Sequence, residues 1–291
     1  LSETAGAILL GRLADIYGRR ALFTLSLALE VAALLLLVPF YSNIVALAVL
    51  TSLMTFGIGG EYGAAYAAIA ELAPAKHRGK ALMITTNFWN IGATLIAGLA
   101  LIYAALNENV ATQIQYLLFS ALGTAVAAGL VRIAFPESPR WLALKGRTLE
   151  AIELVKRLTG YSGKILVFVE RHSNPGISLA EALRRYWFRF TVLAVITVVQ
   201  YVTYDVTAYY LPYAPGFVFG VSTVPMLIFI ANLGASTGAF LLLPLIDYAR
   251  RLTVLLAFLG GTATAITILV FHNLAHPLAF YATLFVNLVF S

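Results

Sequence analysis

GRLADIYGRR, residues 11–20, is a short charged segment between two long apolar runs. Such a segment is typical of a tight turn that joins two membrane-spanning helices. A weaker copy, LIDYARR at residues 245–251, follows several further apolar runs. One charged turn that occurs twice, about half a large membrane protein apart, predicts a two-lobed transporter built from duplicated halves.

The composition indicates an integral membrane protein. Hydrophobic residues make up 61% of the chain and charged residues 11%, against about 45–50% and about 25% in soluble domains. The mean hydropathy is +0.89. The chain has no cysteine, and its four histidines are too scattered for a metal ligand set, so we expect no metal and no cofactor. Because the chain begins at Leu1 and ends inside an apolar run, we expect it to be a fragment.

The apolar runs predict an all-α membrane protein. A membrane span needs about 20 mostly apolar residues, and these runs are too long and too evenly apolar for barrel strands. The first and last runs look clipped. The candidate spans are 2–16, 21–40, 44–73, 81–105, 112–135, 187–212, 223–246, 252–271 and 277–291.

The connections between these runs alternate in charge. Those at 41–43, 106–111, 213–222 and 272–276 contain no Lys or Arg. By the positive-inside rule the basic connections are cytoplasmic, which predicts a multi-pass protein of the cell membrane. This topology accounts for the net charge of +6, so we expect contact with membrane lipids and none with nucleic acid. The predicted cytoplasmic loops are 17–20, 74–80, 136–186 and 247–251.

A long polar segment at 136–186 divides the chain. It contains two amphipathic helical patterns, at about 147–158 and about 178–190. We expect residues 1–135 to form one lobe, the polar segment to be an inter-lobe loop, and residues 187–291 to belong to a second lobe.

Three segments resemble motifs of the major facilitator superfamily. Residues 11–20 resemble its G-x-L-a-D-r-x-G-R-R loop between helices 2 and 3. Residues 71–79 (ELAPAKHRG) resemble the E-x-x-P-x-x-x-R-G that closes helix 4 in sugar porters, and residues 136–141 (PESPRW) resemble their P-E-S-P-R motif. The resemblance implies two six-helix lobes in the full protein, of which this chain would hold about helices 2–10.

The same resemblance implies a cytoplasmic gate, because the acidic and basic members of these motifs form an intracellular charge network. The second copy has lost the glycine of the first, which predicts a stronger gate in the first lobe. The expected gate residues are Asp15, Arg19, Arg20, Glu71, Arg78, Glu137, Arg140, Asp247 and Arg250.

Two carboxylates lie deep in their spans. Glu61 is about 22 Å along a helix from Lys76, and Asp205 is about 24 Å from Arg189. A charge near the middle of a membrane costs at least about 2.5 kcal/mol, so such a residue suggests a function. A buried carboxyl group can exchange protons near neutral pH, and we expect Glu61 and Asp205 to couple transport to protons. The alternative is a locally paired acid. For Glu30 we expect packing or a polar helix contact.

The surroundings of the two acids resemble different transporters. Residues 57–62 (GIGGEY) resemble the G-x-G-G-[DE]-Y pattern of phosphate:proton and metabolite:proton symporters. Residues 200–210 keep Gln200 and Tyr209 of the sugar-porter helix-7 pattern, but Asp205 replaces its Asn. Asp205 and Tyr209 also fit the phosphate-symporter pattern. The resemblance implies that Gln200 and Tyr209 bind substrate.

Asn87 and Asn90 lie three residues apart and share a helix face. Either they line the substrate site or they form hydrogen bonds between helices.

The leading hypothesis is a monomeric secondary active transporter that moves a small polar metabolite, a sugar or a related compound, by alternating access with protons. The alternatives are an organic acid or phosphate:proton symporter, a passive uniporter and, remotely, a non-transporting nutrient sensor. We find no deep Lys or Arg to neutralise an anion, which counts against the anion alternative. No nucleophile–base spacing appears, so we expect no enzyme and no catalytic residues.

Overall fold

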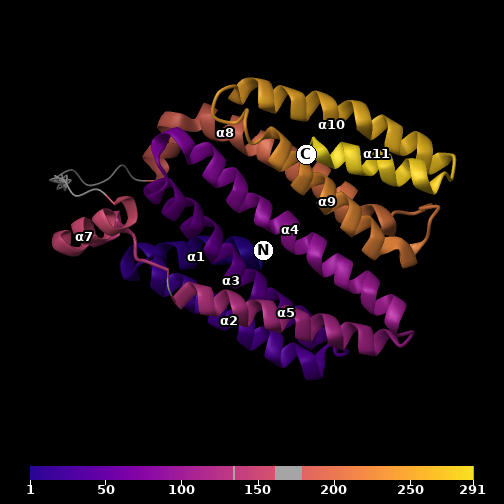
Figure 1. Ribbon diagram of the computed structural model, residues 1–291, viewed down its shortest axis with the longest axis horizontal. Helices are drawn as coiled ribbons and strands as arrows, with labels where there is room; N and C mark the ends of the chain where they lie inside the picture. The colour runs from indigo at the N-terminus through magenta and orange to yellow at the C-terminus, as the bar shows by residue number, and fades with distance from the viewer. Residues whose placement is uncertain (134, 161–178, 291) are drawn as a thin grey trace. The chain divides into compact units, whose positions relative to one another are not determined.

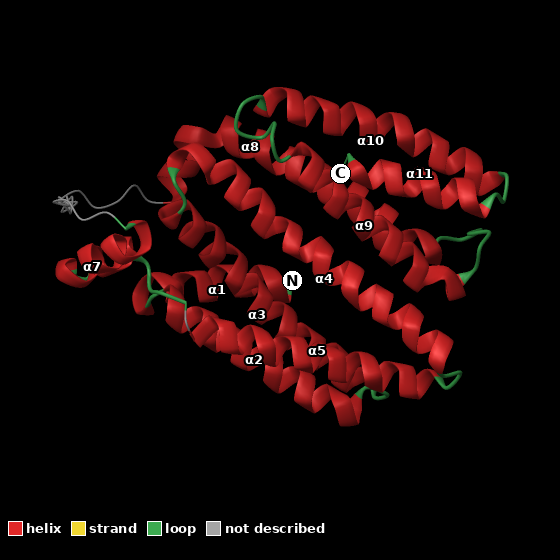
Figure 2. Cartoon of the chain, in the orientation of Figure 1, coloured by secondary structure: helices red, strands yellow, loops and turns green. Residues whose placement is uncertain are grey.

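The computed structural model describes residues 1–133, 135–160 and 179–290, and within these ranges the chain is helical with no strand (Figure 2). Figure 1 shows how the helices follow one another along the chain. The long helices are α1 (Ser2–Tyr17), α2 (Arg19–Phe40), α3 (Ile44–Leu72), α4 (Arg78–Leu106), α5 (Val110–Ile133), α8 (Leu179–Asp205), α9 (Val224–Leu242), α10 (Arg250–Asn273) and α11 (Pro277–Val289).

Seven of the described helices are long and apolar enough to cross a membrane, and α11 is a shorter apolar helix. Large apolar side chains on these helices are exposed, for example Leu95 on α4 and Phe258 on α10. Such surfaces are costly in water and suit contact with lipid. The prediction of an all-α, multi-pass membrane protein is therefore confirmed.

Two short helices lie in the polar segment. α7 (Thr148–Thr159) matches the predicted amphipathic helix at 147–158 and ends at Gly160, whose φ of 68° is left-handed. α6 (Pro139–Leu144) was not predicted. It begins with Ser138, whose side chain accepts a hydrogen bond from the Trp141 amide, and a proline follows at the first helical position.

The second amphipathic pattern, at 178–190, does not form a helix of its own. Its described part is continuous with the following span in α8, with one kink at Tyr186. No proline or glycine lies between Leu179 and Asp205, so no helix-breaking residue interrupts the backbone hydrogen bonds of α8. The span then continues as a π turn, Val206–Tyr210, and a 3₁₀ turn, Leu211–Tyr213.

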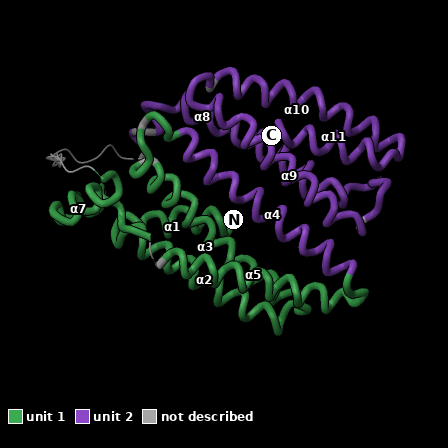
Figure 3. Tube along the Cα trace, in the orientation of Figure 1, with its two compact units in different colours: residues 1–78, 106–170 green, residues 79–105, 171–291 purple. Residues whose placement is uncertain are grey.

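The chain divides into two compact units (Figure 3). Unit 1 comprises residues 1–78 and 106–170, and unit 2 comprises residues 79–105 and 171–291. Helix α4 thus groups with the later helices, although it belongs to the first lobe in the sequence-based scheme. The lobe boundaries at 1–135, 136–186 and 187–291 stay a prediction, and residues 161–178 of the expected loop lie outside the described residues.

In unit 1, α3 packs against α1 and α2, and α5 packs against α2. Leu10, Leu22 and Ala64 are buried at the contact of the first three helices. The α1–α3 crossing is close because Gly59 has no side chain: a Cβ there would collide with the backbone carbonyl of Glu3. This crossing holds α3, which carries the neighbouring Glu61, close against α1.

In unit 2, α11 packs against both α9 and α10. The core of unit 2 is formed by buried residues that include Leu227, Phe280, Leu284 and Leu288. A Cβ at Gly238 of α9 would collide with the carbonyl of Val289, so this crossing also needs a glycine.

Candidate functional site

The first charged turn is built around the carboxylate of Glu137. The Arg19 amide donates a hydrogen bond to it at 2.8 Å and the Arg20 amide at 3.3 Å. These amides belong to the first turn of α2 and have no partner within the helix, so the carboxylate satisfies them and complements the helix dipole. Gly18 has a φ of 102°, and a Cβ there would collide with the Glu137 carboxylate. The geometry explains why this turn contains a glycine.

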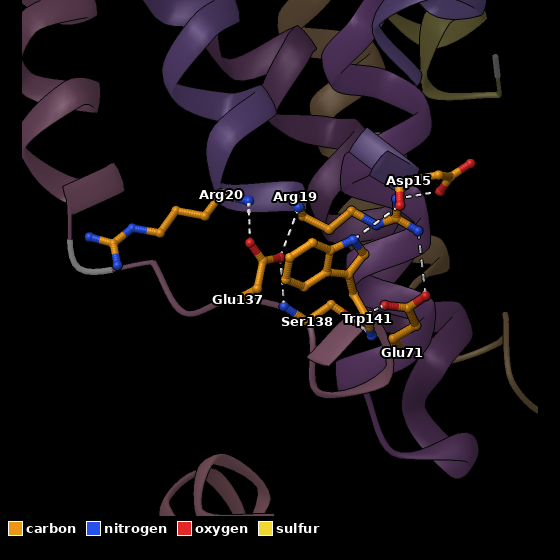
Figure 4. Close-up of polar contacts among 7 residues, drawn as sticks. All are labelled: Asp15, Arg19, Arg20, Glu71, Glu137, Ser138 and Trp141. Carbon is orange, nitrogen blue, oxygen red and sulfur yellow. Dashed lines mark hydrogen bonds and ion pairs between the residues drawn. The ribbon is translucent and has the colours of Figure 1, made fainter. Parts of the chain in front are cut away.

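The guanidinium group of Arg19 joins two further acids. It lies 2.6 Å from Asp15 and 3.7 Å from Glu71 (Figure 4). Glu71 accepts a hydrogen bond from the hydroxyl group of Ser138. The side chains of Arg19 and Glu71 are only 12% and 13% exposed, whereas that of Asp15 is 70% exposed. We call Asp15, Arg19, Glu71, Glu137 and Ser138 the first-turn cluster.

The first-turn cluster brings together all three sequence motifs, as their resemblance implied. Trp141 adds a hydrogen bond from its indole N–H to the backbone carbonyl of Asp15, at 3.1 Å. Ser138 and Trp141 were not among the predicted residues, although both belong to the quoted PESPRW motif. In Figure 4 the Arg20 side chain extends away from Arg19. Arg78 and Arg140 are exposed and take part in none of the described ion pairs.

The second charged turn has a different environment. A Cβ at Gly79 would lie 2.5 Å from Oδ1 of Asp247, so this carboxylate lies against the start of α4. Oδ2 of Asp247 is buried without a hydrogen-bond partner among the described residues. The ammonium group of Lys80 lies 5.6 Å from the centre of the Tyr248 ring. The side chain of Arg250 lies outside the described residues.

The deep acid of unit 1, Glu61, forms a bidentate ion pair. Its two carboxylate oxygens lie 2.6 and 2.7 Å from the two terminal nitrogens of Arg132. Arg132 also donates to the carbonyl of Phe23 at 2.9 Å, and the hydroxyl group of Ser26 donates to Glu61. The Glu61 and Arg132 side chains are 19% and 25% exposed. Such planar, two-point pairs are the strongest ion pairs that proteins form.

This pair adds an arginine that the sequence-based prediction did not connect with Glu61. Arg132 is one residue from the end of α5, and its long side chain reaches Glu61 on α3. The sequence could have indicated this partner, because Arg132 is the one basic residue inside the apolar run 112–135. For Glu61 the alternative of a locally paired acid is therefore the one that the structure describes.

The deep acid of unit 2, Asp205, is the last residue of α8, where the helix widens into the π turn. It is half-buried, and the described part of the chain provides no hydrogen bond or ion pair to its carboxylate. π turns are frequent at functional sites. Gln200, one of the expected substrate-binding residues, is exposed on the same helix.

Beside Asp205, a polar network connects α4, α8 and α9. The hydroxyl group of Tyr204 lies 2.8 Å from Oδ1 of Asn90 and 2.6 Å from Oδ1 of Asn232. The hydroxyl group of Tyr209 lies 3.2 Å from the same oxygen of Asn232. Asn232 is fully buried and was missed by sequence analysis, although it is a single amide inside an apolar run. It is the centre of this network.

The two expected substrate amides of α4 take part in the same network. Asn87 is buried and donates to Oγ of Ser236 at 3.2 Å, and Asn90 donates to Oδ1 of Asn87 at 3.2 Å. Both thus form hydrogen bonds between or along helices, while a role in substrate binding stays a prediction. Among the described residues, no three acidic or histidine side chains gather where a metal ion could bind.

Comparison with known proteins identifies the family of this chain. The model of the family "Sugar (and other) transporter" matches residues 1–291. The inner membrane metabolite transport protein YgcS of Escherichia coli is 30% identical over 217 residues, which cover 71% of this chain and 45% of that protein. The arabinose-proton symporter of Bacillus subtilis is 30% identical over 164 residues, covering 55% and 35% of the two chains. The chain thus spans less than half the length of these relatives.

The fold matches a solved transporter. The major facilitator superfamily proton:xylose symporter XylE, solved with 6-bromo-6-deoxy-D-glucose, superposes with a TM-score of 0.63 and 18% sequence identity. The match covers 99% of this chain and 66% of that chain. It confirms the predicted fold class.

Proposed function

The chain belongs to the sugar (and other) transporter family, and on this premise we propose that it forms most of a secondary transporter that carries a small polar metabolite by alternating access. The observation that carries the proposal is the family match over residues 1–291, together with seven helices suited to cross a membrane. We place the protein in the cell membrane, as a monomer in contact with lipids, with its basic loops in the cytoplasm.

We propose a sugar or related polyol as the substrate. The arginine that contacts Glu61, Arg132, uses both terminal nitrogens for this acid and so offers no free positive charge to an organic acid or phosphate. The network around Asn232 consists of amides and hydroxyl groups, which can exchange their mutual hydrogen bonds for those of a polyol. Gln200 and Tyr209 keep their place as proposed substrate contacts.

We propose that transport is coupled to protons. The arabinose-proton symporter among the relatives supports this mechanism. Of the two deep acids, Asp205 is the better candidate to take up and release the coupled proton during transport, because its carboxylate has no described counter-charge. The rival mechanism is a passive uniporter, which would need no titrating acid.

We propose that the first-turn cluster acts as a gate. The Arg19–Asp15 ion pair has one exposed partner, Asp15, so it costs little to break and re-form as the lobes move. Glu137 would release the first turn of α2 when the gate opens. The second turn, with Asp247 and Arg250, would make a weaker contribution.

The test is uptake by the full-length protein in proteoliposomes, with a panel of pentoses, hexoses, organic acids and phosphate. We expect saturable uptake of a sugar or polyol. A proton gradient in the same direction as substrate movement should accelerate this uptake. Uptake that ignores the gradient would identify a uniporter, and uptake of anions alone would favour the organic acid or phosphate alternative. Glu71→Gln should alter the rate of exchange, whereas the exposed Glu108→Gln serves as a matched control.

A further inference from the structure

A third acid lies inside the membrane-spanning part of unit 1. Glu30 is near the middle of α2, about midway between Arg19 and Phe40. Its side chain packs against α3: a Cβ at Gly57 would lie 3.6 Å from Cγ and 3.8 Å from Oε1 of Glu30. Oε1 is buried and has no hydrogen-bond partner among the described residues.

Glu30 shares its surroundings with the Glu61–Arg132 pair. The charged groups that act on its carboxyl group are Glu61 of α3 and Arg132 of α5. Helix α1 also packs against α2, but its charged residues, Glu3, Arg12 and Asp15, are not among the groups that act on Glu30. Two carboxyl groups therefore face a single arginine.

The arginine is committed to one of the two acids. Arg132 holds both oxygens of Glu61, and its remaining described bond goes to the Phe23 carbonyl. Ser26 also donates to Glu61. Glu30 receives none of these donors. An ionised carboxylate that is buried without a donor is unfavourable, whereas the protonated form removes the charge and supplies a donor of its own.

We propose that Glu30 binds an exchangeable proton beside the Glu61–Arg132 ion pair, which makes it a second proton-binding residue, in a different unit from Asp205. With the proton bound, Glu30 can donate to the Glu61 carboxylate, and the three side chains are together neutral. When the proton leaves to water, the site holds one excess negative charge between α2, α3 and α5. Protonation therefore stabilises the packing of these three helices.

The proton site is separate from the proposed substrate contacts, all of which lie in unit 2. A role of Glu30 in coupling rests on the proposed proton-driven transport, but its protonation does not. Infrared spectroscopy of the full-length protein in lipid tests the protonation directly, because a protonated carboxyl group absorbs at a different frequency from a carboxylate. The variants are Glu30→Gln, with Asp205→Asn and the exposed Glu108→Gln as controls.

We expect wild type to show protonated-carboxyl absorption that disappears as the pH rises, and Glu30→Gln to lack the component that belongs to Glu30. Asp205→Asn and Glu108→Gln should retain it. In wild type we expect substrate exchange at equal concentrations to slow severalfold as the pH rises. Glu30→Gln should weaken this slowing. A protonated-carboxyl band that persists unchanged in Glu30→Gln overturns the proposal. A wild-type exchange rate that responds to the Na⁺ concentration and not to pH also overturns it.

The same experiment separates this proposal from the proposed function. If wild type moves substrate without protons but the band still depends on Glu30, symport fails and the proton site stands. If protons move with substrate while Glu30→Gln keeps both its band and its pH dependence, symport stands and the proton site fails. A circular dichroism spectrum equal to that of wild type shows that Glu30→Gln is folded.

Discussion

Glu61 and Asp205 look alike in sequence, since each is a single acid deep in an apolar span, but the structure gives them opposite environments. Glu61 is held by two short bonds from Arg132 and by the hydroxyl group of Ser26. Asp205 lies at a helix-to-π transition, and no described group pairs with its charge.

The difference teaches that depth alone does not identify a proton-binding acid. A carboxylate in a bidentate pair has its charge compensated, and taking up a proton would cost it that pair. A carboxyl group without a counter-charge of its own, such as that of Asp205 or Glu30, has no such pair to break. The same sequence feature therefore serves structure in one unit and is available for function in the other.

The largest effect should come from removing the counter-charge of Glu61. Arg132→Gln leaves a buried carboxylate without its partner, which we expect to lower the free energy of unfolding by about 3 kcal/mol. Thermal unfolding in detergent, followed by size-exclusion chromatography, measures this loss. The exposed Arg157→Gln on α7 is the control.

The double variant Arg132→Met with Glu61→Leu removes both charges and should recover most of the stability that Arg132→Gln loses. Equal melting temperatures for Arg132→Gln and wild type would show that the ion pair is not structural, and the contrast with Asp205 would disappear.

Next in size is Asn232→Ala, which removes the acceptor that Tyr204 and Tyr209 share beside Asp205. We expect a loss of about 1–3 kcal/mol, because the Tyr209 hydroxyl group loses its described acceptor and the Tyr204 hydroxyl group keeps only Asn90. Tyr209→Phe is the graded comparison, since it removes only the longer of the two bonds and should cost less. If the order of the two melting temperatures is reversed, Asn232 is not the centre of the network.

Asp205→Asn should barely change stability, by less than about 0.5 kcal/mol, since the carboxylate has no described partner to lose. Stimulation of uptake by a proton gradient should nevertheless be abolished, while exchange at equal concentrations remains. Uptake assays in proteoliposomes, combined with thermal unfolding, check both parts. Asp205→Asn that unfolds as readily as Arg132→Gln would contradict the proposed contrast between the two acids.

The smallest effect is expected for an ion pair outside the membrane-spanning helices. Arg147 donates two hydrogen bonds to Glu150 on α7, and these bonds lower the pKa of the Glu150 carboxyl group. The stabilisation is therefore present above the pKa of the unfolded chain and is lost as the pH falls through the lower folded value. Because both side chains are exposed, Glu150→Gln should leave the melting temperature unchanged at neutral pH.

Much of the candidate site was predictable where a motif carried it. The resemblance of residues 11–20, 71–79 and 136–141 implied that Arg19, Glu71 and Glu137 meet, and the structure shows them in one cluster. The prediction did not include Arg132, Ser138 and Asn232. Each is a single polar residue whose role depends on the side chain that it contacts in another segment. The two amides of α4 left two alternatives open, and the structure shows their bonds to other side chains.

The sequence by itself determined where the long apolar helices lie, because the length of a spanning apolar run follows from the thickness of the membrane. Of the nine predicted runs, seven correspond to described helices long and apolar enough to span, while 2–16 and 277–291 correspond to shorter helices. It also located the charged turns, since a short charged segment with glycine between two apolar runs is typical of a loop at the membrane surface. Only the tertiary structure decided which polar side chains pair. A helix that is apolar on every side carries no pattern that says which face meets which neighbour. That choice paired Glu61 with Arg132 and left Glu30 and Asp205 without a counter-charge of their own.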